Sequence, residues 1–308
     1  MSIYYPYFRA KQFEVSAITN LAPQLAQKGS IIPIFEPVTR SSLQIIKCAS
    51  KFATTHLTVA FILNPRVGAV VNNLQTTEQM FQDMKKQGSD VIPALIVDQH
   101  TSIAEINCLN RQMKHKAPLF IHAGNASATI INTLASINGK HIFKDGAVGL
   151  SYVKNFQAGS RLLMRDGFKA QRRNRDFPSN SFFDDLHLNY VSLGFAGFGD
   201  YATVGDHFSS TGGPAYAVAI HITEDDNNGI VCNHFVSSSN ATTANPGGKF
   251  GEALDSLINY SRLNPGKIDF SNAYHTFYNF HINQHFPGLG EVKRLSIEHH
   301  LELMCRLV

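Results

Sequence analysis

The feature that most constrains the fold is a regular alternation of short apolar runs with segments of helical periodicity. Five apolar runs, each bounded by turn residues, lie in the first half of the 308-residue chain, at 31–38, 57–65, 91–98, 118–124 and 141–146. Helical periodicity covers 10–27, 41–54, 73–87, 102–116 and 126–138. Apolar strands separated by helices of this length indicate βαβ units and a parallel sheet.

The alternation changes after residue 146. A long connection, 147–193, carries a basic segment and a helical stretch, and strand-like runs resume at 194–201, 215–223 and 229–237. The link between the last two runs is too short for a parallel crossover, which needs roughly a dozen residues. We therefore expect these two runs to pair antiparallel, or the second to leave the sheet. Helical patterns follow at 248–261, 271–284 and 291–306.

About eight strands in this order favour an α/β fold, a (β/α)8 TIM-like barrel with an irregular closing segment and extra C-terminal helices. We expect one domain over residues 1–308, since such barrels typically take about 250 residues. No G-x-G-x-x-G turn follows the first strand, which argues against a dinucleotide-binding sheet. The 44% of hydrophobic residues supplies a large core, and the 16% of charged residues excludes a disordered chain.

Nearly every apolar run ends in an ionisable or amide side chain. Catalytic groups of such barrels come from the C-terminal ends of the strands, so these residues predict a polar site at one rim. They are Glu36, Asn64, Asp98, His122, Lys144 with Asp145, Asp200 and His221.

Two of these residues form the centre of the predicted site. Period-two alternation puts His221 on the alanine-rich face of its run and aligns Asp200 with Phe198, so we expect Asp200 and His221 on neighbouring strands. They would act as an acid–base or metal-binding pair, or satisfy each other as a buried hydrogen-bonded pair. The predicted catalytic residues are Asp200, His221, Glu36, Asp98 and His122. A divalent metal such as Mg²⁺ or Mn²⁺ would suit this set, although the sequence specifies none.

A basic segment, 161–177, supplies the predicted phosphate-binding groups. Arginine forks match phosphate and carboxylate, and the glycine-rich loop 209–214 offers backbone N–H groups for an anion. The residues are Arg161, Arg165, Lys169, Arg172, Arg173, Arg175, Gly212 and Gly213. The expected ligand is a phosphate-bearing small molecule or a nucleic acid. The alternative is a solvated helix face whose arginines pair with Asp166 and Asp176.

The remaining features carry weaker signals. The four cysteines, Cys48, Cys108, Cys232 and Cys305, include no CxxC pair and are expected to be buried, reduced thiols. No signal-like N-terminus precedes the first run, and the longest apolar run is too short to span a bilayer, so we expect a cytoplasmic protein without membrane contact. His281 and His285 have a zinc-compatible spacing but no accompanying Glu, and core or surface histidines are the favoured interpretation.

Several stretches together resemble the beta-like protein family of bacterial and mobile-element proteins, whose genes often lie beside restriction-type nucleases. They are YYPYFRAKQFE, IPIFEPV, FFDDLHLNY, GFGDY, GGPAYAVAIHIT, GKFGEAL and LSIEHHLELM. The resemblance spans almost the whole chain and implies a barrel-like protein in a defence or genome-conflict setting such as phage defence. It implies no catalytic assignment, because the family has no settled activity.

Two functions follow from the site and the resemblance. The first is a phosphoester hydrolase, phosphoesterase-like or nuclease-like, that acts on a nucleotide or nucleic acid within a defence system. The second is a non-catalytic sensor or binding subunit that partners a nuclease-type protein and docks nucleic acid through the basic segment.

Overall fold

The computed structural model describes residues 3–41, 43–113, 116–210, 213 and 215–308. The chain forms two compact units. The first comprises Met1–Arg165, Leu188–Asp200 and Val308, and the second comprises Asp166–His187 and Tyr201–Leu307.

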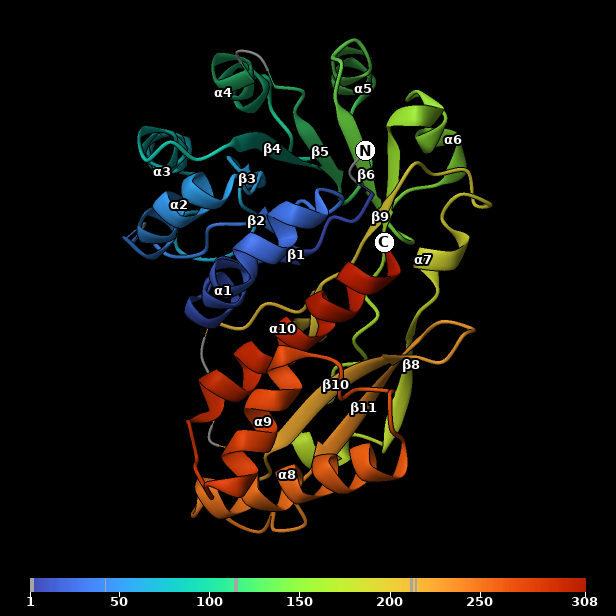
Figure 1. The fold of residues 1–308 in the computed structure, drawn as a ribbon. Helices are drawn as coiled ribbons and strands as arrows, with labels where there is room; N and C mark the ends of the chain where they lie inside the picture. The colour runs from blue at the N-terminus through green and yellow to red at the C-terminus, as the bar shows by residue number, and fades with distance from the viewer. Residues whose placement is uncertain (1–2, 42, 114–115, 211–212, 214) are drawn as a thin grey trace. The chain divides into compact units, whose positions relative to one another are not determined.

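The first unit is a parallel barrel of eight strands surrounded by helices (Figure 1). Every neighbouring pair runs parallel. In spatial order the strands are β1 (Tyr7–Phe8), β2 (Ile34–Phe35), β3 (Val59–Ile62), β4 (Val91–Val97), β5 (Leu119–His122), β6 (Lys140–Lys144), β7 (Arg161–Met164) and β9 (Phe198–Gly199). The helices are α1 (Gln12–Lys28), α2 (Leu43–Thr55), α3 (Leu74–Lys86), α4 (Ile103–Met113), α5 (Ala128–Ala135) and the short α6 (Leu150–Val153).

The barrel closes where β9 meets the N-terminal segment. The amide of Phe198 donates to the carbonyl of Ile3 at 2.7 Å, and the amide of Tyr5 donates to the carbonyl of Phe198 at 2.9 Å. Gly197 and Gly199 permit this approach, because a Cβ on Gly197 would lie 2.7 Å from the Ile3 carbonyl oxygen and one on Gly199 would collide with that of Tyr5. The sequence therefore requires glycine where the two ends of the sheet meet.

Local sequence signals explain where the barrel helices begin and end. The side chain of Asn73 accepts from the amide of Thr76 at the start of α3, and the side chain of Ser127 accepts from the amide of Ile130 at the start of α5. The chain leaves α1 through Gly29, whose φ of 67° is the left-handed conformation that glycine adopts without strain.

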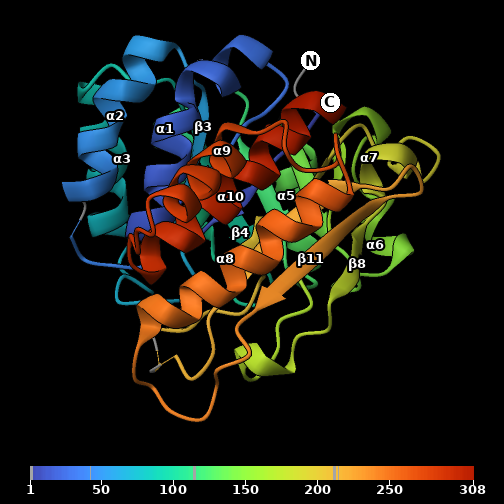
Figure 2. The ribbon, with the colours of Figure 1, turned by 60° about the horizontal axis from the view of Figure 1, so that its bottom comes forward.

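The second unit is built on a three-stranded antiparallel sheet in the order β10 (Ala219–Asp225), β11 (Ile230–Val236), β8 (Asn180–Asp184). The helices α8 (Pro246–Leu263), α9 (Asn272–Ile282) and α10 (Leu289–Leu307) belong to the same unit, and Figure 2 shows α8 beside β11. Ile220 and Ile222 lie in one apolar core with Phe250, Leu254 and Leu257 of α8, so this core covers one face of the sheet.

The predicted fold class is confirmed, but two barrel strands were misassigned. Arg161–Met164, expected within a basic helical connection, is the barrel strand β7, and Tyr7–Phe8 of the aromatic opening is β1. The runs at 215–223 and 229–237 pair antiparallel, as expected, but lie outside the barrel. The link of residues 226–229 joins β10 to β11 as a hairpin, and the side chains of Ile220, Ile222 and Phe235 pack into the apolar core that α8 completes.

Two further expectations concern membrane contact and the number of domains. Among the described residues, no helix has both the length and the apolar character that crossing a bilayer requires. That residues 1–308 act as a single domain stays a prediction.

Candidate functional site

Glu36 lies directly after β2, where the carboxylate accepts two hydrogen bonds. The Tyr7 hydroxyl donates at 2.8 Å, and the backbone amide of Arg66 donates at 2.8 Å. Burial raises the pKa of the Glu36 carboxyl, and the bonds from Arg66 and Tyr7 and the charge of Arg9, 3.6 Å away, oppose that rise. Glu36 is thus a buried acid held in place by its neighbours.

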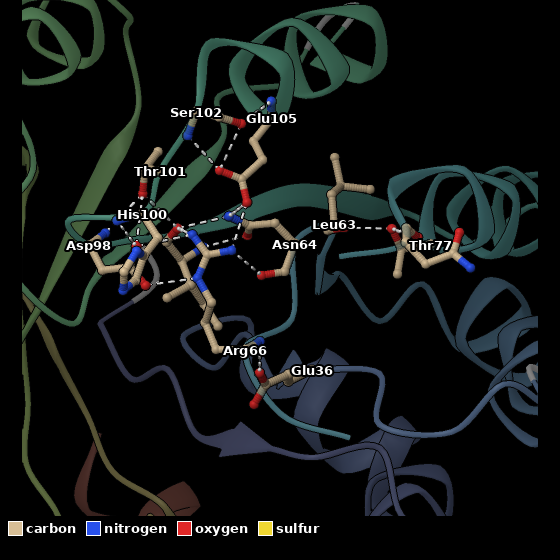
Figure 3. A network of polar contacts seen from close by, with 12 residues as sticks. Glu36, Leu63, Asn64, Arg66, Thr77, Asp98, His100, Thr101, Ser102 and Glu105 are labelled. Atoms are coloured by element: carbon tan, nitrogen blue, oxygen red, sulfur yellow. Dashed lines mark hydrogen bonds and ion pairs between the residues drawn. The ribbon is translucent and has the colours of Figure 1, made fainter. Parts of the chain in front are cut away.

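Asp98, after β4, is held by one guanidinium (Figure 3). Arg66 Nε donates to one Asp98 oxygen at 2.7 Å and a terminal nitrogen to the other at 3.2 Å, while the third nitrogen donates to Glu105 at 2.6 Å. Asn64 also donates to Glu105, at 3.0 Å. Burial alone would lower the pKa of Arg66, but its bonds to Asp98 and Glu105 together raise that pKa above its usual value. These charges compensate one another, which makes this a network that stiffens the ends of the strands.

Asp200 follows β9 and is bound within the barrel unit. The Tyr4 hydroxyl lies 2.9 and 3.0 Å from its two carboxylate oxygens. The predicted pairing with His221 on a neighbouring strand is wrong, because β9 pairs with β7 and β10 pairs with β11 in a separate sheet.

His122 ends β5 as expected, but its side chain is fully buried beside α6. The ring stacks on Phe143 at 4.6 Å, and its two nitrogens lie 2.9 Å from the Tyr152 hydroxyl and 3.0 Å from His141 Nδ1. Burial lowers the pKa of His122 well below its usual range and that of His141 to about 3. Both imidazoles are therefore neutral members of an aromatic cluster that also includes Phe156.

The predicted phosphate-binding residues are divided between the two units. The Arg161 guanidinium donates to the carbonyl of Phe156 at 2.8 Å, and Arg165 pairs with Asp145 at 2.7 Å, both within the barrel unit. In the second unit Lys169 is exposed and Arg175 lies 3.7 Å from Asp176. Three arginines and a glycine of this set line a cavity of about 720 Å³ in the second unit: Arg172, Arg173, Arg175 and Gly213. Gly212 lies outside the described residues.

The second unit assembles a different group, formed by His221, Cys232 and His234 and named here the His–Cys–His cluster. His221 on β10 and His234 on β11 are direct partners in the antiparallel register, and their Nδ1 atoms lie 2.8 Å apart. Cys232 precedes His234 by two residues and so projects from the same face of β11, with Sγ 3.9 Å from His234 Nδ1. One potential ligand atom from each of the three residues lies within 4.8 Å of the others.

The protonation states of the His–Cys–His cluster follow from burial. Burial, together with the neighbouring His234, lowers the pKa of His221 to about 3, and burial lowers that of His234 to about 4. Burial raises the pKa of the Cys232 thiol. At neutral pH both imidazoles are thus uncharged and offer lone pairs, which is the form that binds metals.

The surroundings of the His–Cys–His cluster orient its ligands. Ser181 Oγ on β8 lies 2.9 Å from His234 Nε2, so a proton on Nε2 leaves Nδ1 free to face the cluster. The rings of Phe168 and Phe177 pack at 5.0 and 4.6 Å from His221. His221 also lines a cavity of about 330 Å³, named here the His221 cavity.

Sequence reasoning identified His221 but missed its partners. Cys232 was interpreted as a buried thiol, and His234 was not singled out. The signal was present: in Cys-x-His within a strand both side chains face one way, and the short link 224–228 makes that strand the hairpin partner of the one bearing His221.

The comparisons with known proteins add limited information. A solved structure described as DHDPS from Cyanidioschyzon merolae with lysine bound is similar to this chain, with a TM-score of 0.42 and 13% identity over 66% of this chain and 70% of that one. Similarity at this level carries no argument about activity. No family model and no curated protein matches the chain, and membership of the beta-like protein family stays a prediction.

The predicted function is wrong in both of its forms, the phosphoester hydrolase and the sensor that partners a nuclease. The hydrolase form required Asp200 and His221 on adjacent strands, and both forms required the polar strand-end residues at one rim with the arginines gathered beside them. The two residues lie in separate sheets, and the arginines are divided between two units. None of the comparisons supports a role in defence.

Proposed function

We propose that the second unit binds one transition-metal ion, zinc by preference, through His221, Cys232 and His234, and uses it to activate water for hydrolysis. The single observation that supports this is the convergence of three potential ligand atoms from adjacent strands within 4.8 Å of one another. The site depends on the backbone register of β10 and β11, which is a rigid support for ligands.

The spacing of the ligand atoms is close to what zinc needs. Ordinary Zn–N and Zn–S bond lengths at tetrahedral angles place two nitrogens roughly 3.4 Å apart and a nitrogen and a sulfur roughly 3.6 Å apart. The Nδ1 atoms of His221 and His234 are 2.8 Å apart, and Cys232 Sγ is 3.9 Å from His234 Nδ1. These two distances differ from the ideal by roughly half an ångström, and the third pair, His221 with Cys232, lies within 4.8 Å, so the ion is fitted by side-chain adjustments of up to about 1 Å.

The donor set selects the kind of metal. Two imidazoles and one thiolate suit zinc and similar soft or borderline ions, whereas Mg²⁺ and Mn²⁺ prefer oxygen ligands. This replaces the expectation of Mg²⁺ or Mn²⁺ that the strand-end carboxylates suggested. A reducing cytoplasmic location would keep Cys232 available, and all four cysteines are free thiols.

Three protein ligands leave the fourth tetrahedral position for water. Catalytic zinc sites have this composition and lower the pKa of the bound water to about 7, whereas structural sites use four protein ligands. Among the described residues, no fourth His, Cys, Asp or Glu joins the cluster, and His221 borders a cavity. Hydrolysis at a polarised carbonyl group is the reaction class that fits.

Metal content and cobalt spectroscopy test the proposal. Protein purified without chelator should carry about one zinc per chain, and Co²⁺ should give the intense ultraviolet absorption of a cobalt–thiolate bond. Cys232→Ser should abolish that absorption, whereas Cys108→Ser, at another buried free thiol, should retain it. Zinc absent from the purified protein together with no cobalt–thiolate absorption would refute the proposed function.

A further inference from the structure

We propose that the His221 cavity and the arginine-lined cavity beside it form one substrate site for a short peptide-like amide with a free carboxylate. The amide carbonyl would lie at the His–Cys–His cluster and the carboxylate at the arginines. This inference rests on the proposed function for its chemistry, and its anion-binding part can be measured without the metal.

The His221 cavity combines an apolar wall with several polar groups. The wall includes the rings of Phe168 and Phe177 and the side chains of Val218 and Val292, and the polar lining residues are Gln171, Asn174, Thr203, His221, Lys293 and Ser296. At about 330 Å³ it lies at the small end of the range for ligand pockets, roughly 300–1,000 Å³. A side chain or acyl group fits there, while a large polar ligand does not.

The second cavity, named here the arginine cavity, has a cationic wall. Arg172, Arg173 and Arg175 line it, and no Asp or Glu lies among its described lining residues. Arg175 has Asp176 at 3.7 Å, whereas Arg172 and Arg173 form no ion pair with any described residue. Two uncompensated guanidinium forks on one wall match a carboxylate in a bidentate manner.

One side chain joins the two cavities. Asn174 lines both, and its amide donates to the carbonyl of Ala217 at 2.8 Å, so it is fixed against the segment that leads into β10. Ala217 lines the arginine cavity, and His221 lies four residues further on, about 13 Å of extended chain. An extended peptide of about four residues spans the same distance, which sets the length of the ligand.

The reaction that this site would carry out balances as a simple hydrolysis. The oxygen of water forms a bond to the amide carbonyl carbon, and the bond from that carbon to nitrogen breaks. One proton of the water passes to the departing nitrogen, which gives a carboxylic acid and an amine. No oxidant, reductant or further co-reactant is needed.

Binding of two matched peptides tests the inference. The probes are an N-acetylated tetrapeptide of apolar residues with a free C-terminal carboxylate and the same peptide with a C-terminal carboxamide, titrated calorimetrically into zinc-loaded and metal-free protein. The carboxylate form should bind at least tenfold more tightly in both states. Arg172→Gln combined with Arg173→Gln should remove this preference and leave zinc content unchanged, whereas Arg262→Gln, at an exposed arginine elsewhere in the second unit, should retain it.

The outcomes separate this inference from the proposed function. Equal affinity for the two peptides, or a preference that survives in the double variant, would overturn the substrate assignment even if zinc binds. A carboxylate preference without zinc binding would overturn the proposed function and retain the arginine cavity as a carboxylate site. Mass spectrometry of the zinc-loaded mixture should show the two cleavage products, and an intact peptide after prolonged incubation would refute the hydrolysis.

Discussion

His221 Nδ1 lies 2.8 Å from His234 Nδ1 across the β10–β11 pair, with the two residues directly opposite in the antiparallel register. Two neutral imidazoles at this distance share one hydrogen bond, and replacing the shared proton by a metal ion satisfies both nitrogens at once. The register thus makes the pair ready for a metal without any rearrangement of the backbone.

Zinc should stabilise the second unit through this pair. A ligand present at one hundred times its dissociation constant, and bound only by the folded state, adds about 2.7 kcal/mol to the free energy of unfolding. The melting temperature should rise with zinc in the wild-type protein. His234→Ala should abolish the rise, and His281→Ala, at a histidine paired with Asp255, should leave it intact. An equal rise in all three proteins would show that zinc binds elsewhere.

The positions of the candidate site residues on the barrel strands could be predicted from the sequence only in part. Glu36 and Asp98 were correctly placed at strand ends, since apolar runs that end in an acid are visible in the sequence. The inward position of His122 was not justified, because Phe120 and His122 share one face of β5, and both rings contact outer aromatic residues. Parity alone groups His122 with Phe120, and only the packing of the folded chain identifies that face as the outer one.

Other parts of the fold could not be inferred from local pattern. β1 has only two residues, so no periodicity can reveal it. β7 begins at Arg161, so its sequence was interpreted as part of the basic connection. The alanine-rich run that leads into β10 resembles a barrel interior in sequence, and its place in another sheet depends on long-range packing against α8. Cys232 and His234 became a candidate site only once the hairpin register was known.

The barrel should lose stability in mild acid because of His122 and His141. Folding holds their imidazoles neutral, with the pKa of His141 lowered from 6.5 to about 3 and that of His122 lowered as well. Below pH 6.5 the unfolded chain binds more protons than the folded one, so the free energy of unfolding falls as pH falls, by up to about 1.4 kcal/mol per pH unit for each histidine.

Urea unfolding at a series of pH values between about 4 and 7 measures this slope. His141→Phe keeps a ring beside Phe120 but removes one titrating imidazole, so the free energy of unfolding should fall less steeply with pH, by the contribution of about one bound proton. The free energy of unfolding near neutral pH should also fall, because His122 loses a hydrogen-bond partner. Tyr152→Phe removes a hydrogen bond but no titrating imidazole, so it should lower the free energy of unfolding by a similar amount at every pH. An unchanged slope in His141→Phe would contradict the assignment.

Arg66 should be worth more to stability than an ordinary surface arginine. Arg66→Met would leave Asp98 and Glu105 without their shared cation in a partly buried place. Breaking a fully buried pair costs about 3–5 kcal/mol, and partial exposure reduces this to about 2 kcal/mol. Arg111→Met removes a solvent-exposed pair with Glu78 and should cost clearly less than Arg66→Met. Chemical unfolding of both variants compares them directly, and equal losses would show that the Arg66 network does not stiffen the barrel.

Closure of the barrel should depend on the absence of a side chain at Gly199. A Cβ there would collide with the Tyr5 carbonyl oxygen and lie 3.1 Å from the Met164 methyl group. Because backbone on the neighbouring strand cannot move aside as a side chain can, Gly199→Ala should destabilise the barrel by about 1–3 kcal/mol, the usual cost of overpacking.

Gly251→Ala is the matched control, since Gly251 lies within α8 with nothing within 4 Å of an added Cβ. That variant should be more stable by up to about 1 kcal/mol, the difference in helix propensity. The melting temperatures of the two variants should therefore shift in opposite directions. A Gly199→Ala protein with the melting temperature of the wild type would show that the barrel tolerates a larger distance between β9 and the N-terminal segment.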